Sequence, residues 1–429
     1  MAREQSAKGV IVAGLVGSLW RSAALRAAAA LGISGLALAC GNLLLARVLP
    51  TSEFARFALF FAIVQIGINV GPFGADVILT RRHFDPGPHL HRQVFFTSAI
   101  AALVLAAISK ILYPLSNVLL GLMLLAIAAG GVRVVAVSHF RSRQRFGVAL
   151  LLTMSTNMGL LIASGIAFAL HADSAVLPAA AMAIALCIAA WLGSHAVAAA
   201  GSLATDPTPG YPISEAWSAV SFIGAGMVLG SLERLITPSL LGLQALATFS
   251  VLATIAGSPF QMLHQGIGYT LLPSLRNALN HTARRRVVIH EGLVAGAACV
   301  VSSLVVWWLT PVIIRTVLDN RYVISWQLML AAICAGYVKV FGSVAAAAVN
   351  ALGSGRDLAR LSLAGWLAIG TALLAAWFGA RWGLTGVVYG VGLGWLLRAL
   401  VAGQLAARHL AGKEEAPGPP NTKSAARTT

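Results

Sequence analysis

Charged residues are scarce in this sequence. Of its 429 residues, 10% are Asp, Glu, Lys or Arg, and only 13 are acidic. Soluble domains carry about 25% charged residues. Hydrophobic residues make up 58% of the chain, mean hydropathy is +0.84, and no hydrophilic stretch is long enough to fold alone. We therefore expect one membrane-embedded unit without a separate soluble domain.

Cysteine is also rare, and its placement excludes two classes of site. The four residues Cys40, Cys187, Cys299 and Cys334 all fall in apolar stretches, with no paired spacing and no neighbouring His. This pattern is typical of small buried side chains rather than of a disulfide framework or a metal site. A phosphate-binding loop of the form G-x-x-x-x-G-K-[ST] is absent from the sequence, so ATP hydrolysis by that route is excluded. We expect no cofactor and no enzymatic activity.

What the chain has instead is a series of continuous apolar runs. A helix needs about 20 apolar residues to cross the ~30 Å hydrocarbon core. The runs do not alternate between apolar and polar residues, so a membrane β-barrel is excluded. The fold class expected is an all-α polytopic membrane protein of about 12 transmembrane helices. The predicted spans are 22–47, 54–79, 93–112, 115–139, 147–170, 175–200, 215–238, 243–272, 287–310, 323–350, 358–379 and 383–408.

The distribution of positive charge predicts the orientation. Most of the 30 Lys and Arg residues lie in the gaps on the side of the two termini. Positive charge is enriched in cytoplasmic loops, so both termini are predicted to be cytoplasmic. The net charge of +17 could indicate binding to nucleic acid, but the positive-inside rule explains where the basic residues lie. No basic stripe runs along any segment, so nucleic acid is not an expected partner.

A polar loop with three prolines divides the chain into two halves of six spans. The predicted organisation is an N-terminal lobe at 1–201, a cytoplasmic linker at 202–214, a C-terminal lobe at 215–411 and a disordered cytoplasmic tail at 412–429. A faint repeat, FARFA at 54–58 and LATFS at 246–250, is at the same place in each half.

Four short motifs resemble a known family. Residues 46–58 read ARVLPTSEFARFA, similar to the A-R-x-L-x-x-x-x-F-G-x-Y-A signature of bacterial polysaccharide and O-antigen flippases. The segment GADVILTRR at 74–82, the loop GSGR at 353–356 and WGLTGV at 382–387 resemble further parts of that family. These flippases are the polysaccharide transporter branch of the multidrug/oligosaccharidyl-lipid/polysaccharide exporter superfamily.

The resemblance covers nearly the whole chain, with mild departures at Ala55, where the family has Gly, and Phe57, where it has Tyr. It implies two six-helix lobes around a central cavity that work by alternating access in the bacterial inner membrane. The implied cargo is a polyprenyl-diphosphate-linked oligosaccharide for O-antigen, capsule or exopolysaccharide. The implied partners are membrane lipids, a polysaccharide polymerase and chain-length machinery.

Basic residues inside the spans are the candidate contacts for such a diphosphate. Moving its charge through a low-dielectric interior is costly unless cations meet it, and the planar fork of arginine binds two phosphate oxygens at once. The candidates are Arg26, Arg133, Arg234, Lys339 and Arg398. The alternative for Arg26, Arg133 and Arg398 is that their long stems carry the charge to the headgroups. For Arg234 the alternative is an ion pair or a charge at the end of a span.

A long stem that carries the charge to the headgroups explains Lys339 least well, because this residue lies in the middle of its span. Ser343 and Asn350 follow it on one helix face, which indicates either a cavity lining or a helix–helix contact. The carboxylates of Asp76 and Glu233 are candidate sites for a coupling ion. Pairing with a nearby Arg, or a position at a helix end, is the alternative for both.

Other transporter classes and membrane enzymes are alternatives to this interpretation. A drug or cation antiporter or a lipid II flippase of the same superfamily stays open, although the mostly basic in-span charges favour an anionic cargo. A membrane glycan polymerase or ligase usually has a large external loop, which this chain lacks. A major facilitator is excluded, because the segment after the second span does not match that family's G-x-x-x-D-R-x-G-R-[RK] motif. Gly71 lies five residues before Asp76, and no Arg directly follows that Asp.

Overall fold

The computed structural model describes residues 23–82, 88–143, 145–199, 213–278 and 280–411, and these form helices joined by short turns. The predicted segment at 202–214 falls almost entirely outside the described residues, and the tail at 412–429 does so completely. The elements are α2 (Ala23–Val48), α3 (Thr51–Val70), α4 (Ala75–Arg82), α5 (Pro88–Leu112), α6 (Asn117–Ser142), α7 (Phe146–Ala169), α8 (Val176–Ala199), α9 (Ile213–Leu241), α10 (Leu243–Ile255), α11 (Gly257–Asn277), α12 (His281–Thr316), α13 (Trp326–Leu352), α14 (Gly355–Gly379), the 3-10 turn η1 (Ala380–Trp382) and α15 (Gly383–Leu410).

The all-α polytopic fold is confirmed. Within the described residues, nine segments are long and apolar enough to cross a membrane, or ten if the bent pair α10 and α11 forms one span. One of these segments, 355–410, contains both α14 and α15, which pack against each other. Each predicted span therefore corresponds to one helix, or to two helices separated by a break.

The second predicted span, 54–79, is wrong as a continuous helix. It is divided into α3 and α4 by a turn at 71–74 that contains Pro72. Phe73 and Gly74 both adopt positive φ, at 53° and 75°. Left-handed residues end an α-helix, and glycine takes that conformation at little cost.

The eighth predicted span, 243–272, is also broken, by a bend of 54° between α10 and α11. The break at Ala256 lies three residues before Pro259. A proline has no N–H to donate to the carbonyl four residues earlier, here that of Ile255, and its ring clashes with that carbonyl. The bend is therefore the consequence of Pro259 acting one turn upstream.

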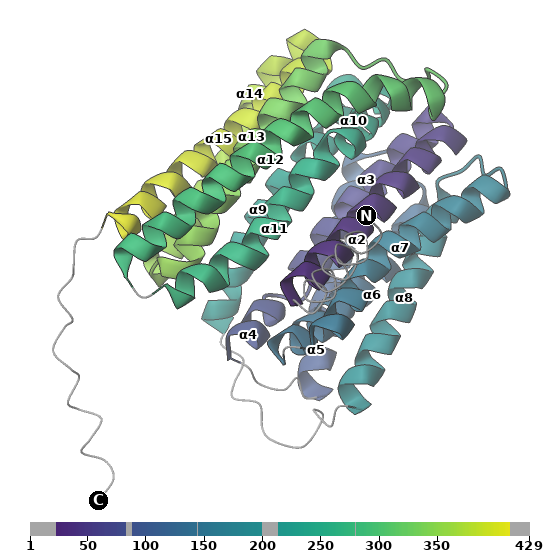
Figure 1. The fold of residues 1–429 in the computed structure, drawn as a ribbon. Coiled ribbons are helices and arrows are strands. Elements are labelled where there is room, and N and C mark those ends of the chain that lie inside the picture. Colours follow the sequence, from purple (N-terminus) through teal and green to yellow (C-terminus); the bar gives the residue numbers. More distant parts are fainter. Residues whose placement is uncertain (1–22, 83–87, 144, 200–212, 279, 412–429) are drawn as a thin grey trace, which may run out of the picture.

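The helices of the two halves of the chain lie on opposite sides of the bundle, as Figure 1 shows in purple to blue and in green to yellow. They meet where α9, α10 and α11 pack against α2, α3 and α4. We call the end of the bundle where α9 begins and α15 ends the inner end, and the opposite end, near residues 317–325, the outer end. The charge bias predicts that the inner end is cytoplasmic.

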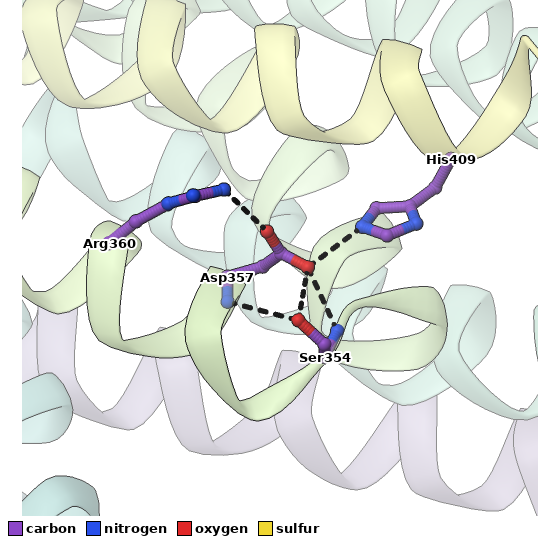
Figure 2. A network of polar contacts seen from close by, with 4 residues as sticks. All are labelled: Ser354, Asp357, Arg360 and His409. Carbon is purple, nitrogen blue, oxygen red and sulfur yellow. Dashed lines mark hydrogen bonds and ion pairs between the residues drawn. The ribbon is translucent and has the colours of Figure 1, made fainter.

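A polar network joins α14 to α15 at the inner end (Figure 2). Ser354 caps α14, and its backbone N–H and hydroxyl both donate to the Asp357 carboxylate, at 3.0 and 2.7 Å. His409, in the last turn of α15, lies with its Nε2 atom 3.1 Å from the same carboxylate, and Arg360 lies 3.4 Å from it. The network ties the start of one helix to the end of the next.

Candidate functional site

An ion pair lies inside the C-terminal half of the bundle. Lys339, near the middle of α13, places its Nζ atom 2.9 Å from the Oε1 atom of Glu233 on α9. The Glu233 side chain is 3% exposed and that of Lys339 is 28% exposed. From the sequence, Lys339 is predicted to contact the cargo and Glu233 to bind a coupling ion. The structure brings them together, so that each neutralises the other in the apolar interior.

A tryptophan and a second cation lie beside this pair. The Nζ atom of Lys339 is 5.4 Å from the centre of the Trp395 ring on α15. The guanidinium carbon of Arg398, one turn further along α15, is 5.7 Å from the same ring and 5.6 Å from the ring of Phe222 on α9. Aromatic faces attract cations at such distances. Arg398 is therefore held by two rings, and among the described residues no carboxylate pairs with it.

Helix α11 is the fourth helix that contributes to this group of residues, after α9, α13 and α15. His264 on this helix lies with its Nδ1 atom 3.4 Å from the Lys339 carbonyl oxygen, and its ring centre is 6.4 Å from that of Trp395. The bend before Pro259 sets the direction of α11. The cluster is defined by Phe222, Glu233, His264, Lys339, Trp395 and Arg398. It draws on four helices and contains two basic side chains and one carboxylate.

The remaining predicted residues lie in three different settings. Arg234, next to Glu233, is half-buried and makes no hydrogen bond with any residue the structure describes. Ser343 donates to the Val340 carbonyl at 2.7 Å, and Asn350 lies half-buried near the inner end of the same helix. For Arg26, the structure places the backbone in α2, and its side chain is outside the described part.

Arg133 and Asp76 belong to the N-terminal half, apart from the cluster. Arg133 is buried on α6 and donates through Nη1 to the carbonyls of Leu152 and Thr153 on α7, at 2.8 and 3.3 Å. Asp76 lies in the first turn of α4, where its Oδ1 atom is buried and meets no hydrogen-bond donor among the described residues. The contacts of Arg133 join two helices of one half.

A loop of the C-terminal half closes over the outer end of α2. Arg321 donates through Nη1 to the carbonyl oxygens of Arg47 and Leu49, at 2.7 and 3.3 Å. The hydroxyl of Tyr322 donates to the Ala46 carbonyl at 3.1 Å. The last carbonyls of a helix have no partner within it, so this loop supplies the missing donors.

A second hydrogen bond between the halves lies at the same end. The Tyr113 hydroxyl, in the turn after α5, donates to the Leu235 carbonyl on α9 at 2.8 Å. Phe54 and Tyr322 also pack edge to face, with ring centres 6.4 Å apart. The two halves are therefore joined at the outer end by hydrogen bonds and a shared apolar core.

Trp395 and Phe222 were missed in the sequence analysis. Trp395 precedes Arg398 by three residues, a spacing that places both on one face of a helix. An aromatic residue one turn from an in-span arginine is therefore a signal that could have found it. Phe222 carried no such signal, because its contact with Arg398 joins residues far apart in the sequence.

Comparison with solved structures identifies the architecture. No protein-family model matches the chain, and no curated protein matches it significantly. A multidrug resistance MATE family transporter of the MOP superfamily, in an inward-facing conformation, superposes with a TM-score of 0.63 over 88% of this chain and 94% of its own, at 14% identity. The chain has the fold of such transporters.

Two further structures agree. The lipid II flippase MurJ, in an inward closed conformation, gives a TM-score of 0.63 over 88% of this chain and 86% of its own, at 11% identity. The Vibrio cholerae MATE transporter VcmN gives 0.55 over 91% and 98%, at 17% identity. The same fold therefore serves proteins described as drug transporters and as a lipid flippase.

Proposed function

We propose that this chain is a transporter of the MOP superfamily that moves a polyprenyl-diphosphate-linked oligosaccharide across the bacterial cytoplasmic membrane. The product serves assembly of a surface polysaccharide such as O-antigen, capsule or exopolysaccharide. In this proposal a polysaccharide polymerase and chain-length machinery act on the cargo after release. Support comes from the shared fold, from the motif resemblance and from the charge of the cluster.

The observation that carries the proposal is the excess of positive charge around Trp395. Glu233 neutralises Lys339, whereas the Arg398 guanidinium lies against two aromatic rings and pairs with no carboxylate among the described residues. A cation in the apolar part of a span is costly and marks a functional site. A cationic drug would be repelled by this arrangement, and a diphosphate would be attracted to it.

The contacts between the halves support an alternating-access mechanism. The outer end is held by Arg321, Tyr322 and Tyr113, while the cluster lies deeper in the bundle. In the proposed cycle, the cargo enters from the inner end and its diphosphate meets the cations. Breaking the outer contacts then lets the halves separate there and release the glycan.

Gene deletion tests the proposed function. The lipids of the deletion strain are extracted and analysed for polyprenyl-diphosphate glycans, alongside surface polysaccharide, with a plasmid-borne wild-type copy as the control. We expect surface polymer to be lost and the lipid-linked repeat unit to accumulate. Unchanged polymer and lipid pools would contradict the proposal. Altered drug tolerance in that case would indicate a drug antiporter, and loss of peptidoglycan synthesis would indicate a lipid II flippase.

A further inference from the structure

One face of α9 runs along the cluster with two glycines between its functional side chains. Phe222, Gly226, Gly230 and Glu233 follow one another at spacings of four, four and three, which places them on one face of the helix. Phe222 contacts Arg398 and Glu233 contacts Lys339, so this face is turned towards α13 and α15. The two glycines leave a stretch of α9 without side chains opposite Trp395 and Arg398.

Gly226 provides the room that the Arg398 guanidinium occupies. A Cβ atom on Gly226 would lie 3.1 Å from Nη1 and 3.4 Å from Nη2 of Arg398. A Cβ atom on Gly365 of α14 would lie 3.9 Å from Nε of Arg398. The guanidinium is thus positioned by two rings and two glycines, and none of its donors meets an acceptor among the described residues.

Trp395 carries a second donor that has no acceptor in the described part of the chain. Its side chain is almost fully buried, at 8% exposed, and its Nε1 atom has no hydrogen-bond partner within the described residues. A Cβ atom on Gly230 would lie 3.9 Å from Cζ2, the ring atom on the same edge as Nε1. A buried N–H without a partner costs free energy, so such groups are rare in folded proteins. The donor edge of the indole therefore faces the bare stretch of α9, and Gly230 there is exposed.

We propose that Arg398 and the indole N–H of Trp395, facing Gly226 and Gly230, form the site that holds a phosphate group carried by a lipid. The inference rests on the proposed function, in that it assigns the diphosphate of the cargo to this place. The site consists of donors only: the planar fork of Arg398 for two oxygens and the Trp395 N–H for a third.

Phosphate fits this donor set better than the other anions of a membrane. A carboxylate offers two oxygens and satisfies the guanidinium alone, whereas a phosphate offers oxygens to both groups. Lys339 is a weaker anchor, because Glu233 already takes its charge. Its role in this site is to keep the potential positive, while the aromatic rings of Phe222 and Trp395 fix the direction of Arg398.

Binding of defined lipids to the purified full-length protein tests the site. Native mass spectrometry in detergent, with polyprenyl diphosphate, polyprenyl monophosphate and phosphatidylglycerol as probes, gives a dissociation constant for each. We expect Arg398→Gln to weaken binding of polyprenyl diphosphate about tenfold or more, since it removes a charge-assisted pair. Trp395→Phe keeps an aromatic ring and removes the N–H together with the five-membered part of the indole, and we expect a loss of about threefold to tenfold.

Arg408→Gln is the matched control, because Arg408 is an exposed arginine near the inner end of the same helix. Equal affinities of wild type, Arg398→Gln and Trp395→Phe would overturn the site, as would an equal loss in Arg408→Gln. Size-exclusion profiles identify any variant that fails to fold. If Arg398→Gln fails to fold, Arg398→Lys, which keeps the charge, replaces it. For Arg398→Lys we expect a loss of affinity for polyprenyl diphosphate smaller than about tenfold.

The probes separate the source of the phosphate. A preference for polyprenyl diphosphate over phosphatidylglycerol that vanishes in Arg398→Gln supports a cargo site. Equal binding of both lipids, lost in the same variant, supports the phosphate site and identifies it as one for bulk lipid. If only the site assignment is wrong, the deletion strain still loses surface polymer and accumulates the lipid-linked repeat unit. If only the proposed function is wrong, Arg398→Gln and Trp395→Phe still weaken lipid binding. The two failures can therefore be distinguished.

Discussion

The ammonium of Lys339 and the carboxylate of Glu233 lie 2.9 Å apart across the contact between α13 and α9. The two residues are 106 positions apart in the sequence. Because the carboxylate is almost fully buried, each charge depends on the other for its stability in the bundle. This dependence makes the pair the first place where the structure can be tested.

Removing one partner of this pair should destabilise the protein strongly. Glu233→Gln leaves the Lys339 ammonium without a counter-charge, and breaking a buried pair costs about 3–5 kcal/mol. We expect a clear fall of the thermal unfolding midpoint in detergent, and recovery of much of it in the double variant Glu233→Gln/Lys339→Gln. Arg47→Gln, which breaks the exposed pair with Asp319, should cost about 1 kcal/mol or less. A double variant as unstable as the single one would contradict the pairing.

Arg133 should be important for stability and not for the phosphate site. Arg133→Met removes charge-assisted hydrogen bonds to two carbonyls of α7, each worth about 1.5–3 kcal/mol. We expect a lower unfolding midpoint with unchanged affinity for polyprenyl diphosphate. Arg145→Met, at an exposed position before α7, is the control. Loss of affinity in a folded Arg133→Met protein would return Arg133 to the list of cargo contacts.

The loop over the outer end of α2 should control access from that side. Leu49 is fully buried beneath this loop, so a cysteine placed there, in a chain without its native cysteines, reports opening. Loss of a hydrogen bond from a charged donor shifts the equilibrium between the closed and open outer end about tenfold. We therefore expect a membrane-impermeant thiol reagent to label Leu49→Cys about tenfold faster when Arg321→Ala is also present. Arg315→Ala, an exposed arginine in the last turn of α12, should change nothing. Equal labelling rates in the two variants would show that Arg321 does not hold the outer end closed.

The inner-end network in Figure 2 should contribute to stability through Asp357. Ser354→Ala removes the cap of α14, at a cost of about 1 kcal/mol. Asp357→Ala also frees His409 and Arg360, so its midpoint should fall further. Asp173→Ala, at an exposed carboxylate, serves as the control. A smaller effect for Asp357→Ala than for Ser354→Ala would contradict the shared role of this carboxylate.

The helical architecture was largely predictable because the bilayer imposes a length and a polarity that single segments reveal. The breaks were harder. Pro259 was visible in the sequence, yet its effect appears one turn upstream, and the left-handed residues Phe73 and Gly74 depend on contacts with α9 that no local pattern carries.

The site was predictable only in parts. Lys339, Glu233 and Arg398 were found one by one, because a charge in an apolar span is conspicuous. Their grouping was not, since it depends on which faces of α9, α13 and α15 meet. The same reason hides Gly226 and Gly230, which have no side chains and matter only through the atoms opposite them.

Transport by the purified protein tests the central proposal most directly. The full-length chain is reconstituted into liposomes with a polyprenyl-diphosphate-linked oligosaccharide, and the fraction of glycan accessible to an external glycosidase is followed with time. We predict that accessibility rises above one leaflet's share with the wild-type protein, and more slowly with Arg398→Gln. Accessibility that stays at one leaflet's share with folded wild-type protein would contradict the flippase.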